Sequence, residues 1–173
     1  MITQQEAAPA LTRLFTEAMT RLVSGVAVVT AQRADGRPCG LLVSSICSYS
    51  VKPPSVLFAV DQASRSYATL VECAQFGVHV LGSTQSTVAS VFASRSDDKF
   101  ADVPWYWDAR VPRLADVPVY LPCTAREVFR HGDHAIIIGD VISGDVQPGD
   151  PLVCYRRRLG WRLHGPEPVH RGG

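Results

Sequence analysis

Apolar residues recur every three or four positions between residues 11 and 22, which is the spacing of one face of a helix. This stripe consists of Leu11, Leu14, Phe15, Ala18, Met19 and Leu22. The pattern predicts an amphipathic helix over residues 11–22 that packs against the rest of the chain. Residues 1–10 carry no such stripe and are expected to form a flexible tail.

From residue 25 onwards the pattern changes to short runs of β-branched and other apolar residues, which favour strands. The predicted strands cover residues 26–30, 40–43, 55–60, 76–81, two arms within 119–146, 151–155 and 161–163. Gly36 suits the turn at 34–37, and residues 131–133 form a tight reversal. The arm at 135–141 is apolar on both faces, so we expect it in the middle of a sheet or at a subunit contact.

Two further helices are predicted over residues 64–73 and 85–93, the second capped by Ser83 or Thr84 with Val88, Val91 and Phe92 facing inward. Residues 94–118 read as a long irregular connection, which in a compact domain is usually functional or part of an interface. Three helices and many short antiparallel strands predict an α+β, mainly antiparallel barrel. We expect one domain over residues 11–165, followed by a loose tail at 166–173.

The composition is that of an ordinary globular domain. The chain has 173 residues, 46% hydrophobic and 19% charged, with a formal net charge of +1. This balance argues against nucleic acid or a membrane surface as a partner. No apolar run approaches the roughly 18 residues of a membrane span and no leader pattern is present, so we expect a cytoplasmic protein. Five irregularly spaced cysteines without a CxxC pair are expected to be reduced.

Several common site motifs are missing from the sequence. There is no GxGxxG, GxxxxGK[ST], HExxH or GxSxG, which argues against a Rossmann site, a P-loop, a zinc protease and a hydrolase elbow. His131 and His134 flank a turn and have no third ligand nearby. No metal site is therefore expected.

Three polar segments remain as candidate chemistry. Residues 44–50 contain four serines beside a buried-type strand, where small side chains let a flat ligand approach the backbone. Ser64-Arg65-Ser66 at a predicted helix start suits an anion such as phosphate, although Ser64 could simply cap the helix. Gly132-Asp133-His134 lies at a hairpin, where His134 could instead be an ordinary turn residue.

Taken in order, these segments resemble the short-chain flavin reductases of two-component monooxygenases. The resemblance covers about residues 13–163. Its matching pieces are residues 24–30, 40–45, 48–50 with Pro53-Pro54, 76–81, 92–93, 99–100, 132–134, 139–141 and 151–153.

The resemblance implies an FMN-binding split β-barrel, usually a homodimer, that binds FMN or FAD. Such enzymes oxidise NADH or NADPH and pass reduced flavin to a separate flavin-dependent monooxygenase or halogenase. The flavin carries the redox chemistry, so no acid–base pair is required. The sequence does not choose between the two flavins or the two nicotinamides.

Roles follow by position in the resemblance. The flavin ring and ribityl chain would lie against Leu42, Val43, Ser44, Ser45, Cys47 and Ser48, with Ser50 in the same wall. The flavin phosphate would be held by Ser64, Arg65 and Ser66, with Phe92, Lys99 and Phe100 at the far side of the flavin or its phosphate end. His134, presented by Gly132 and Asp133, would be the catalytic residue facing the nicotinamide, with Tyr155 and Arg156 as further pocket candidates.

Two alternatives use the same fold. One is a flavoprotein that retains FMN and acts as an oxidase on a small substrate. The other is a non-catalytic flavin-binding protein. A purely structural dimeric module would leave the three polar segments unexplained.

Overall fold

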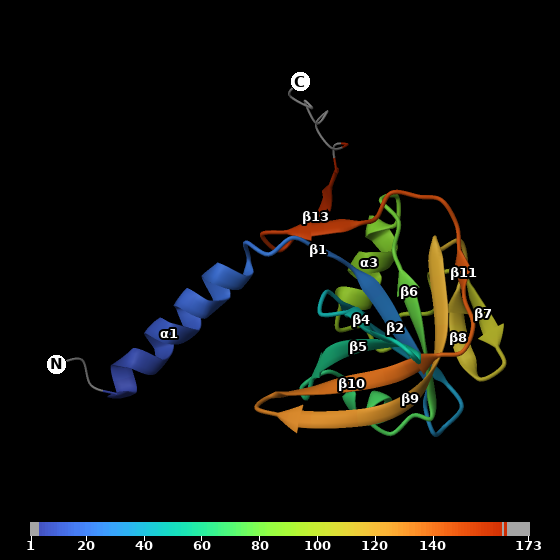
Figure 1. Ribbon diagram of the computed structural model, residues 1–173, viewed down its shortest axis with the longest axis horizontal. Helices are drawn as coiled ribbons and strands as arrows, with labels where there is room; N and C mark the ends of the chain where they lie inside the picture. The colour runs from blue at the N-terminus through green and yellow to red at the C-terminus, as the bar shows by residue number, and fades with distance from the viewer. Residues whose placement is uncertain (1–3, 164, 166–173) are drawn as a thin grey trace.

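The computed structural model describes residues 4–163 and 165, and its main body is a curled antiparallel sheet (Figure 1). Seven strands follow one another in space as β3 (Pro38–Val43), β2 (Ala27–Gln32), β6 (Gln75–Val80), β9 (Val119–His131), β10 (His134–Val141), β5 (Pro54–Asp61) and β4 (Cys47–Val51). A short strand, β11 (Asp145–Val146), pairs with β9.

The sheet must curl because residues 44–46 alone connect its two ends. β3 is one end of the strand order, β4 is the other, and this short link joins them directly. The two edges therefore face each other without pairing along their length, which leaves the barrel split at that point. The predicted split β-barrel is confirmed.

Smaller elements flank the barrel. A second sheet consists of β1 (Ser24–Gly25), β12 (Val153–Tyr155) and β13 (Arg158–Trp161), and a hairpin is formed by β7 (Trp105–Asp108) and β8 (Val111–Leu114). The helices are α1 (Gln4–Met19), α2 (Tyr67–Leu70) and α3 (Ser86–Ala93). Among the described residues, no helix is both long and apolar enough to cross a membrane.

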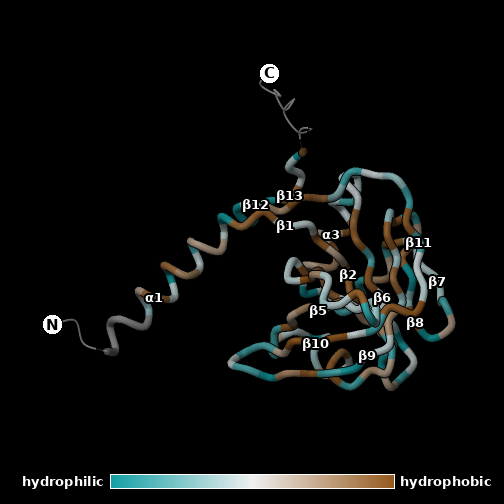
Figure 2. The backbone as a smooth tube through the Cα atoms, viewed as in Figure 1, coloured by the Kyte–Doolittle hydropathy of each residue, from teal (hydrophilic) through white to brown (hydrophobic). Residues whose placement is uncertain are grey.

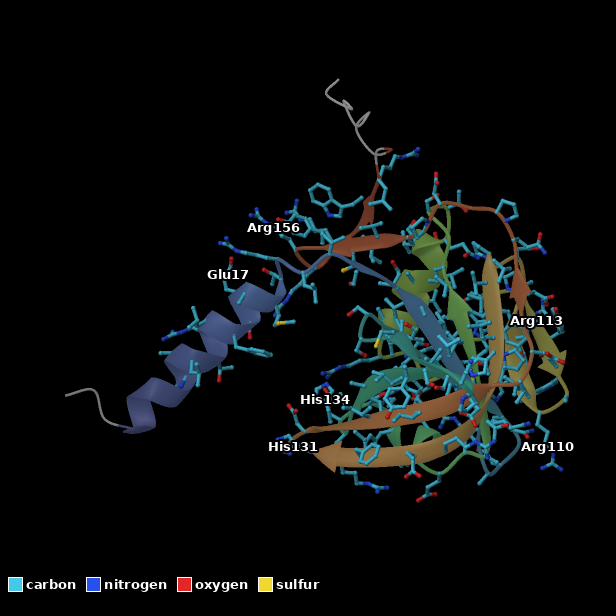
Figure 3. All side chains as sticks on the ribbon, in the orientation of Figure 1. Glu17, Arg110, Arg113, His131, His134 and Arg156 are labelled. Carbon is cyan, nitrogen blue, oxygen red and sulfur yellow. The ribbon has the colours of Figure 1, made fainter. Side chains whose placement is uncertain are left out.

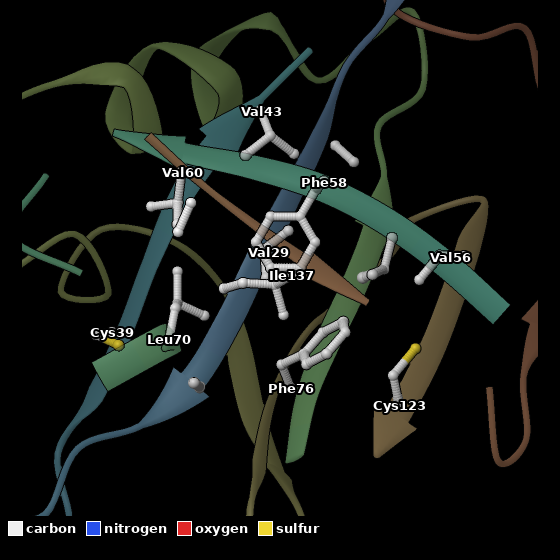
Figure 4. Packing of buried hydrophobic residues seen from close by; sticks show 14 residues of the cluster. Val29, Cys39, Val43, Val56, Phe58, Val60, Leu70, Phe76, Cys123 and Ile137 are labelled. Atoms are coloured by element: carbon white, nitrogen blue, oxygen red, sulfur yellow. The ribbon is translucent and has the colours of Figure 1, made fainter. Parts of the chain in front are cut away.

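Two apolar clusters fill the barrel, and β2 contributes to both because its side chains alternate between faces. Ala27 and Val29 enter the cluster around Phe58, Phe76 and Ile137, which Figure 4 shows from close by. Val26 before the strand and Val28 within it enter the other cluster, with Leu81, Phe92 and Leu152. The interior strands are accordingly brown in the hydropathy colouring of Figure 2.

His79 links three strands inside the barrel. Its side chain is fully buried, and its Nε2 accepts the Leu114 amide at 3.1 Å, which leaves Nδ1 to donate to the Val28 carbonyl at 3.1 Å. The ring also stacks on Tyr120, with centroids 4.9 Å apart. Burial lowers the pKa of His79 to about 3, so the ring is neutral at ordinary pH.

Helix α1 differs from the prediction in two respects. It begins at Gln4, so residues 4–10 of the expected tail are helical. It also projects away from the barrel (Figure 1) instead of packing on it, and Leu11, Leu14 and Phe15 are 63–67% exposed. Periodicity identifies an apolar face but not the surface that covers it. The predicted tail at 166–173 lies outside the described residues.

Four other local predictions were incomplete or wrong. Residues 47–51 form a separate edge strand, β4, and the predicted helix over 64–73 has its helical core only at α2. The connection at 94–118 contains the β7–β8 hairpin. Neither Ser83 nor Thr84 caps α3; Gln85 occupies that position, and its side-chain oxygen accepts the Gly82 amide at 2.8 Å.

The remaining strand predictions hold, apart from shifted boundaries. Gly36 adopts φ +83°, and Gly132 at the β9–β10 turn adopts φ +59°. β10 lies between β9 and β5, which is the central position expected for the arm at 135–141.

Candidate functional site

The candidate site begins at the split in the barrel, where residues 44–46 cross between the sheet edges. The β4–β5 ladder ends with Cys47 opposite Leu57. Beyond it, the Ser45 hydroxyl accepts the Ala59 amide at 3.0 Å and donates to the Ala59 carbonyl at 3.1 Å. One side chain thus replaces the next strand pairing, and Ser45 has no proton left to donate to a ligand.

The other serines of the run divide into structural and open positions. The Ser50 hydroxyl accepts the Lys52 amide at 3.1 Å within the turn. Ser44 and Ser48 are exposed, and no hydrogen bond from their side chains is present in the part of the chain that the structure describes. Of the four serine hydroxyls, these two are the ones open to a ligand.

The loop after β5 brings two of the polar segments together. The Gln62 backbone amide donates to the Asp133 carbonyl at 2.9 Å, and its side-chain amide donates to the Gly132 carbonyl at 3.0 Å. His134 itself lies opposite Asp61 in the β10–β5 register. The loop that carries Ser64–Ser66 is therefore fixed to the hairpin that carries His134.

Gly40 on β3 joins the Ser64–Ser66 segment to Lys99 of the connection at 94–118. Its carbonyl accepts the Ser66 hydroxyl at 3.1 Å and the Lys99 ammonium at 3.3 Å. Lys99 also donates to the Phe92 carbonyl at 2.8 Å. Because an ammonium has three protons, Lys99 keeps one for a ligand. A side chain at position 40 would collide with the Phe92 ring, 2.8 Å from an ideal Cβ.

The cations at this end of the site repel one another. Partial burial lowers the pKa of Lys99, and the Arg65 and Arg33 guanidinium groups lower it further. Arg65 forms an ion pair with Asp97, whose side chain is 91% exposed. An exposed pair of this kind contributes little stability, so a stronger anion can displace Asp97. The hydrogen-bond donors of Arg65 and Lys99 fit a phosphate group.

His134 is paired within its own hairpin. Its Nδ1 lies 2.7 Å from an Asp133 carboxylate oxygen, and this hydrogen bond lowers the pKa of Asp133. About half of the His134 side chain is exposed. Figure 3 places His134 at the tip of the hairpin, away from Arg156 beside the end of α1.

Two cavities adjoin the split. A cavity of about 370 Å³ between α1 and the barrel is lined by Ser44, Ser45 and Arg156, together with Phe15 and Met19 of the helix. A second, of about 710 Å³, is lined by Arg33, Arg37, Pro38, Arg65, Asp97, Asp98, Phe100, Ala101 and Trp105. Ser44 and Ser45, which are expected at the flavin ring, thus line a different cavity from Arg65, which is expected at the flavin phosphate.

Some predicted site residues have mainly structural surroundings. Val43, Ser66, Phe92 and Phe100 are at most 6% exposed, so their side chains offer a ligand little surface. The Tyr155 ring packs edge-to-face on Trp161, and the Arg156 amide donates to the Thr20 carbonyl. Leu42 is half-buried and Cys47 exposed.

Sequence reasoning missed Arg33 and Arg37 at the larger cavity. Both lie in the β2–β3 turn, where charged residues are ordinary and signal no function. Asp97 and Trp105 lie in the connection at 94–118, whose length alone predicts a functional segment or an interface. The signal that could have identified them was a cluster of three arginines and an aromatic residue, which only the fold brings together.

The geometry defines a split β-barrel with Arg65 and Lys99 near its opening, and the comparisons with known proteins give the family. The model of the flavin reductase like domain matches residues 19–161. The chain therefore belongs to the flavin reductase-like family, as the resemblance predicted.

Individual relatives cover most of the chain. The reductase component of a 4-nitrophenol 4-monooxygenase/4-nitrocatechol 2-monooxygenase from Rhodococcus opacus is 34% identical over 84% of this chain and 78% of its own length. An NADH:riboflavin 5'-phosphate oxidoreductase from Streptomyces pristinaespiralis is 36% identical over 90% and 88%. The solved NADH:FAD oxidoreductase of Streptomyces globisporus C-1027, in complex with NAD and FAD fragments, has a TM-score of 0.79 at 28% identity, covering 96% and 98%.

No metal site accompanies this arrangement in residues 4–163 and 165. None of their His, Cys, Asp and Glu side chains gather in a group of three that could hold an ion.

Proposed function

We propose that this protein is an NAD(P)H:flavin oxidoreductase that supplies reduced flavin to a separate flavin-dependent monooxygenase. The observation that carries the proposal is at the Gly40 carbonyl, which accepts both the Ser66 hydroxyl next to Arg65 and the Lys99 ammonium. Gly40 lies on β3, the strand that leads directly into the link at residues 44–46. A bound flavin would supply the redox chemistry, accepting hydride from the nicotinamide.

The chain's own part is to bind and orient. Arg65 and Lys99 neutralise a phosphate, and Ser64 adds a hydroxyl that already accepts the Ser66 amide at 3.3 Å. Ser44 and Ser48 offer open hydroxyls along the ring and ribityl side, while Ser45 fixes the link to Ala59. The Asp97 carboxylate competes with the phosphate for Arg65, which suits a flavin that must leave again.

His134 has the role of a nicotinamide-facing residue in this proposal. Asp133 orients its ring through Nδ1, so Nε2 points away from the turn's own carboxylate. The hairpin is held to the Ser64–Ser66 loop through Gln62, which couples the two halves of the site.

Replacing Arg65 tests the phosphate site. Arg65→Ala should weaken FMN binding by about 1.5–3 kcal/mol, the scale of a charged hydrogen bond. Asp97→Asn is the matched variant: it removes the competing carboxylate and should tighten FMN binding. Titration calorimetry measures both. An unchanged dissociation constant in Arg65→Ala would remove this residue from the phosphate site.

Replacing His134 tests the nicotinamide side. His134→Ala should raise the apparent KM for NADH more than the apparent KM for flavin, because the side chain contacts the donor. His131→Ala, at the far side of the same turn, is the control. The opposite ordering of the two KM changes would exclude the proposed role.

An activity assay separates the proposal from its alternatives. The protein is mixed with NADH or NADPH, each flavin, and air, and absorbance is followed at 340 nm. Consumption of the nicotinamide is expected. If none is consumed with either flavin, the protein is a non-catalytic flavin binder. Flavin retained through gel filtration would favour an oxidase that keeps its FMN.

The proposal includes a homodimer located in the cytoplasm. The apolar face of α1 has no cover within the described chain, and a second copy would supply one. All five cysteines are free thiols, which fits a reducing compartment. A halogenase is the alternative acceptor of the reduced flavin.

A further inference from the structure

The cavity lined by Arg33, Arg65 and Trp105 begins where the proposed flavin-phosphate site ends. Arg65 belongs to that phosphate site and also lines this cavity of about 710 Å³. Arg33, Arg37 and Trp105 line the same cavity. The proposed contacts of FMN, whose phosphate would lie at Arg65, do not involve these three side chains. The relatives do not indicate what occupies this space, because their names include both an FMN and an FAD enzyme.

Arg33 is the cation of the cavity that has no carboxylate of its own, because Asp35, whose pKa it helps to lower, is hydrogen-bonded to Arg37. Arg37 is held by Asp35 through two hydrogen bonds of 2.9 and 2.7 Å, and Arg65 is paired with Asp97. Within the described residues, Arg33 forms no ion pair, and its guanidinium is close enough to Lys99 to lower the pKa of that group.

The acidic residues at the cavity are already engaged. One carboxylate oxygen of Asp98 accepts the amides of Phe100 and Ala101, each at 3.1 Å. Asp97 is highly exposed and displaceable, as described above. Along the cavity, the three arginines Arg33, Arg37 and Arg65 outnumber the two carboxylates of Asp97 and Asp98, so the lining carries a net positive charge that suits a second anionic group.

Aromatic surface completes the cavity. Phe100 is buried, and Trp105 packs edge-to-face on it with centroids 5.2 Å apart while remaining half-buried itself. Trp107 also packs edge-to-face on Trp105, with centroids 5.2 Å apart. A ring held in this way offers a fixed surface on which a purine can stack, an interaction of useful strength for any base.

We infer that this cavity is a subsite for the adenosine-phosphate half of FAD, with Arg33 on the second phosphate and Trp105 against the adenine, so that the protein prefers FAD to FMN. The inference rests on the proposed function, because it takes Arg65 as the first phosphate site. The same adenosine-phosphate chemistry occurs in the nicotinamide dinucleotides, and the experiment separates the two sources.

Binding of FMN and FAD is measured by titration calorimetry on the whole protein. The wild type should bind FAD at least about 10-fold more tightly than FMN, the scale of one charged hydrogen bond. Arg33→Gln should remove most of this difference by weakening FAD about 10-fold, while FMN stays within about twofold. Arg110→Gln is the control and should change neither, because Arg110 lies with Arg33 at a neighbouring cavity but does not line this one.

A second variant guards against a folding effect. Trp105→Leu should also weaken FAD and spare FMN, and its urea unfolding midpoint shows whether the hairpin is intact. Should it fail to fold, Arg33→Gln still decides the question.

Three results overturn the inference. Equal affinities for FMN and FAD in the wild type would show that the cavity contributes nothing. An equal loss for both flavins in Arg33→Gln would place Arg33 in the shared phosphate site. A changed NADPH-to-NADH preference with unchanged flavin affinities would assign the cavity to the nicotinamide. Binding of neither flavin would instead overturn the proposed function itself, and the subsite with it.

Discussion

Phe58 lies at the centre of the barrel, fully buried and edge-to-face with Phe76 at 5.3 Å. Phe15 lies on helix α1, in a cavity wall at the junction with the barrel, and 63% of it is exposed. Both residues belong to regular apolar patterns. The barrel satisfies its pattern within one chain, whereas α1 does not.

The difference separates a barrel whose apolar residues are covered within the chain from a helix whose apolar face is exposed. A helix of 16 residues is marginal in water on propensity alone and is normally stabilised by packing of its apolar face. Leu11, Leu14 and Phe15 receive little of that packing from the barrel. This is why we place a second copy of the chain against α1.

The largest effect is expected inside the barrel. Phe58→Ala removes a fully buried ring and leaves a cavity beside Phe76, so the free energy of unfolding should fall by about 3–5 kcal/mol. Urea unfolding measures the loss. Phe15→Ala is the matched substitution on α1, and its loss should be smaller.

Protein concentration distinguishes the two losses. Contacts between copies stabilise more strongly as concentration rises, so only the loss from Phe15→Ala should grow with it. A similar concentration dependence for both variants would contradict the division between a self-sufficient barrel and a helix that needs a partner.

The next effect concerns assembly. Replacing Leu14 and Phe15 together by serine removes two large apolar side chains from the proposed interface, each contributing about 1.5–3 kcal/mol. The dimer dissociation constant should rise by at least about 100-fold. Analytical ultracentrifugation measures it, and circular dichroism should show the barrel unchanged.

A polar position on the same helix provides the control. Glu17 pairs with Arg21 on the hydrated side of α1, at 3.6 Å with both side chains about two-thirds exposed. Glu17→Gln should therefore leave the dimer unchanged. A monomeric wild type, or equal effects of both changes, would argue against an interface on the apolar stripe.

The fold could be predicted where local pattern and burial agree. Core strands such as β2 and β6 are short, mainly apolar runs buried on both faces, so their sequence indicates both the strand and its place inside the barrel. The edge strand β4 escaped prediction because four of its five residues are exposed, including both Tyr49 and Val51, so its sequence carries no alternation of buried apolar and exposed polar positions. The β7–β8 hairpin escaped because its aromatic residues suggest a loop cluster as readily as a strand.

The site could be predicted only by segment. The sequence identified the serine run, the Arg65 loop and the His134 hairpin, but not which atoms remain open. The Ser45 hydroxyl forms its hydrogen bonds with the Ala59 amide and carbonyl. These bonds depend on where the β4–β5 ladder ends. Arg33 reaches the site only because the β2–β3 turn folds towards Arg65, a proximity without a local signal.

The smallest expected effect is on the pH dependence of the free energy of unfolding, and it concerns the buried His79 of the barrel. The unfolded chain protonates His79 below its usual pKa of about 6.5, whereas the folded chain keeps it neutral down to about 3. The stability from this residue is therefore present above pH 6.5 and falls by about 1.4 kcal/mol per pH unit below it. Urea unfolding between pH 7 and 5 should show a shallower slope for His79→Gln than for the wild type. In NMR spectra of the wild type, the His79 ring should remain neutral while the protein is folded. A ring that titrates near pH 6.5 in the folded state would mean that water reaches the barrel interior at this position.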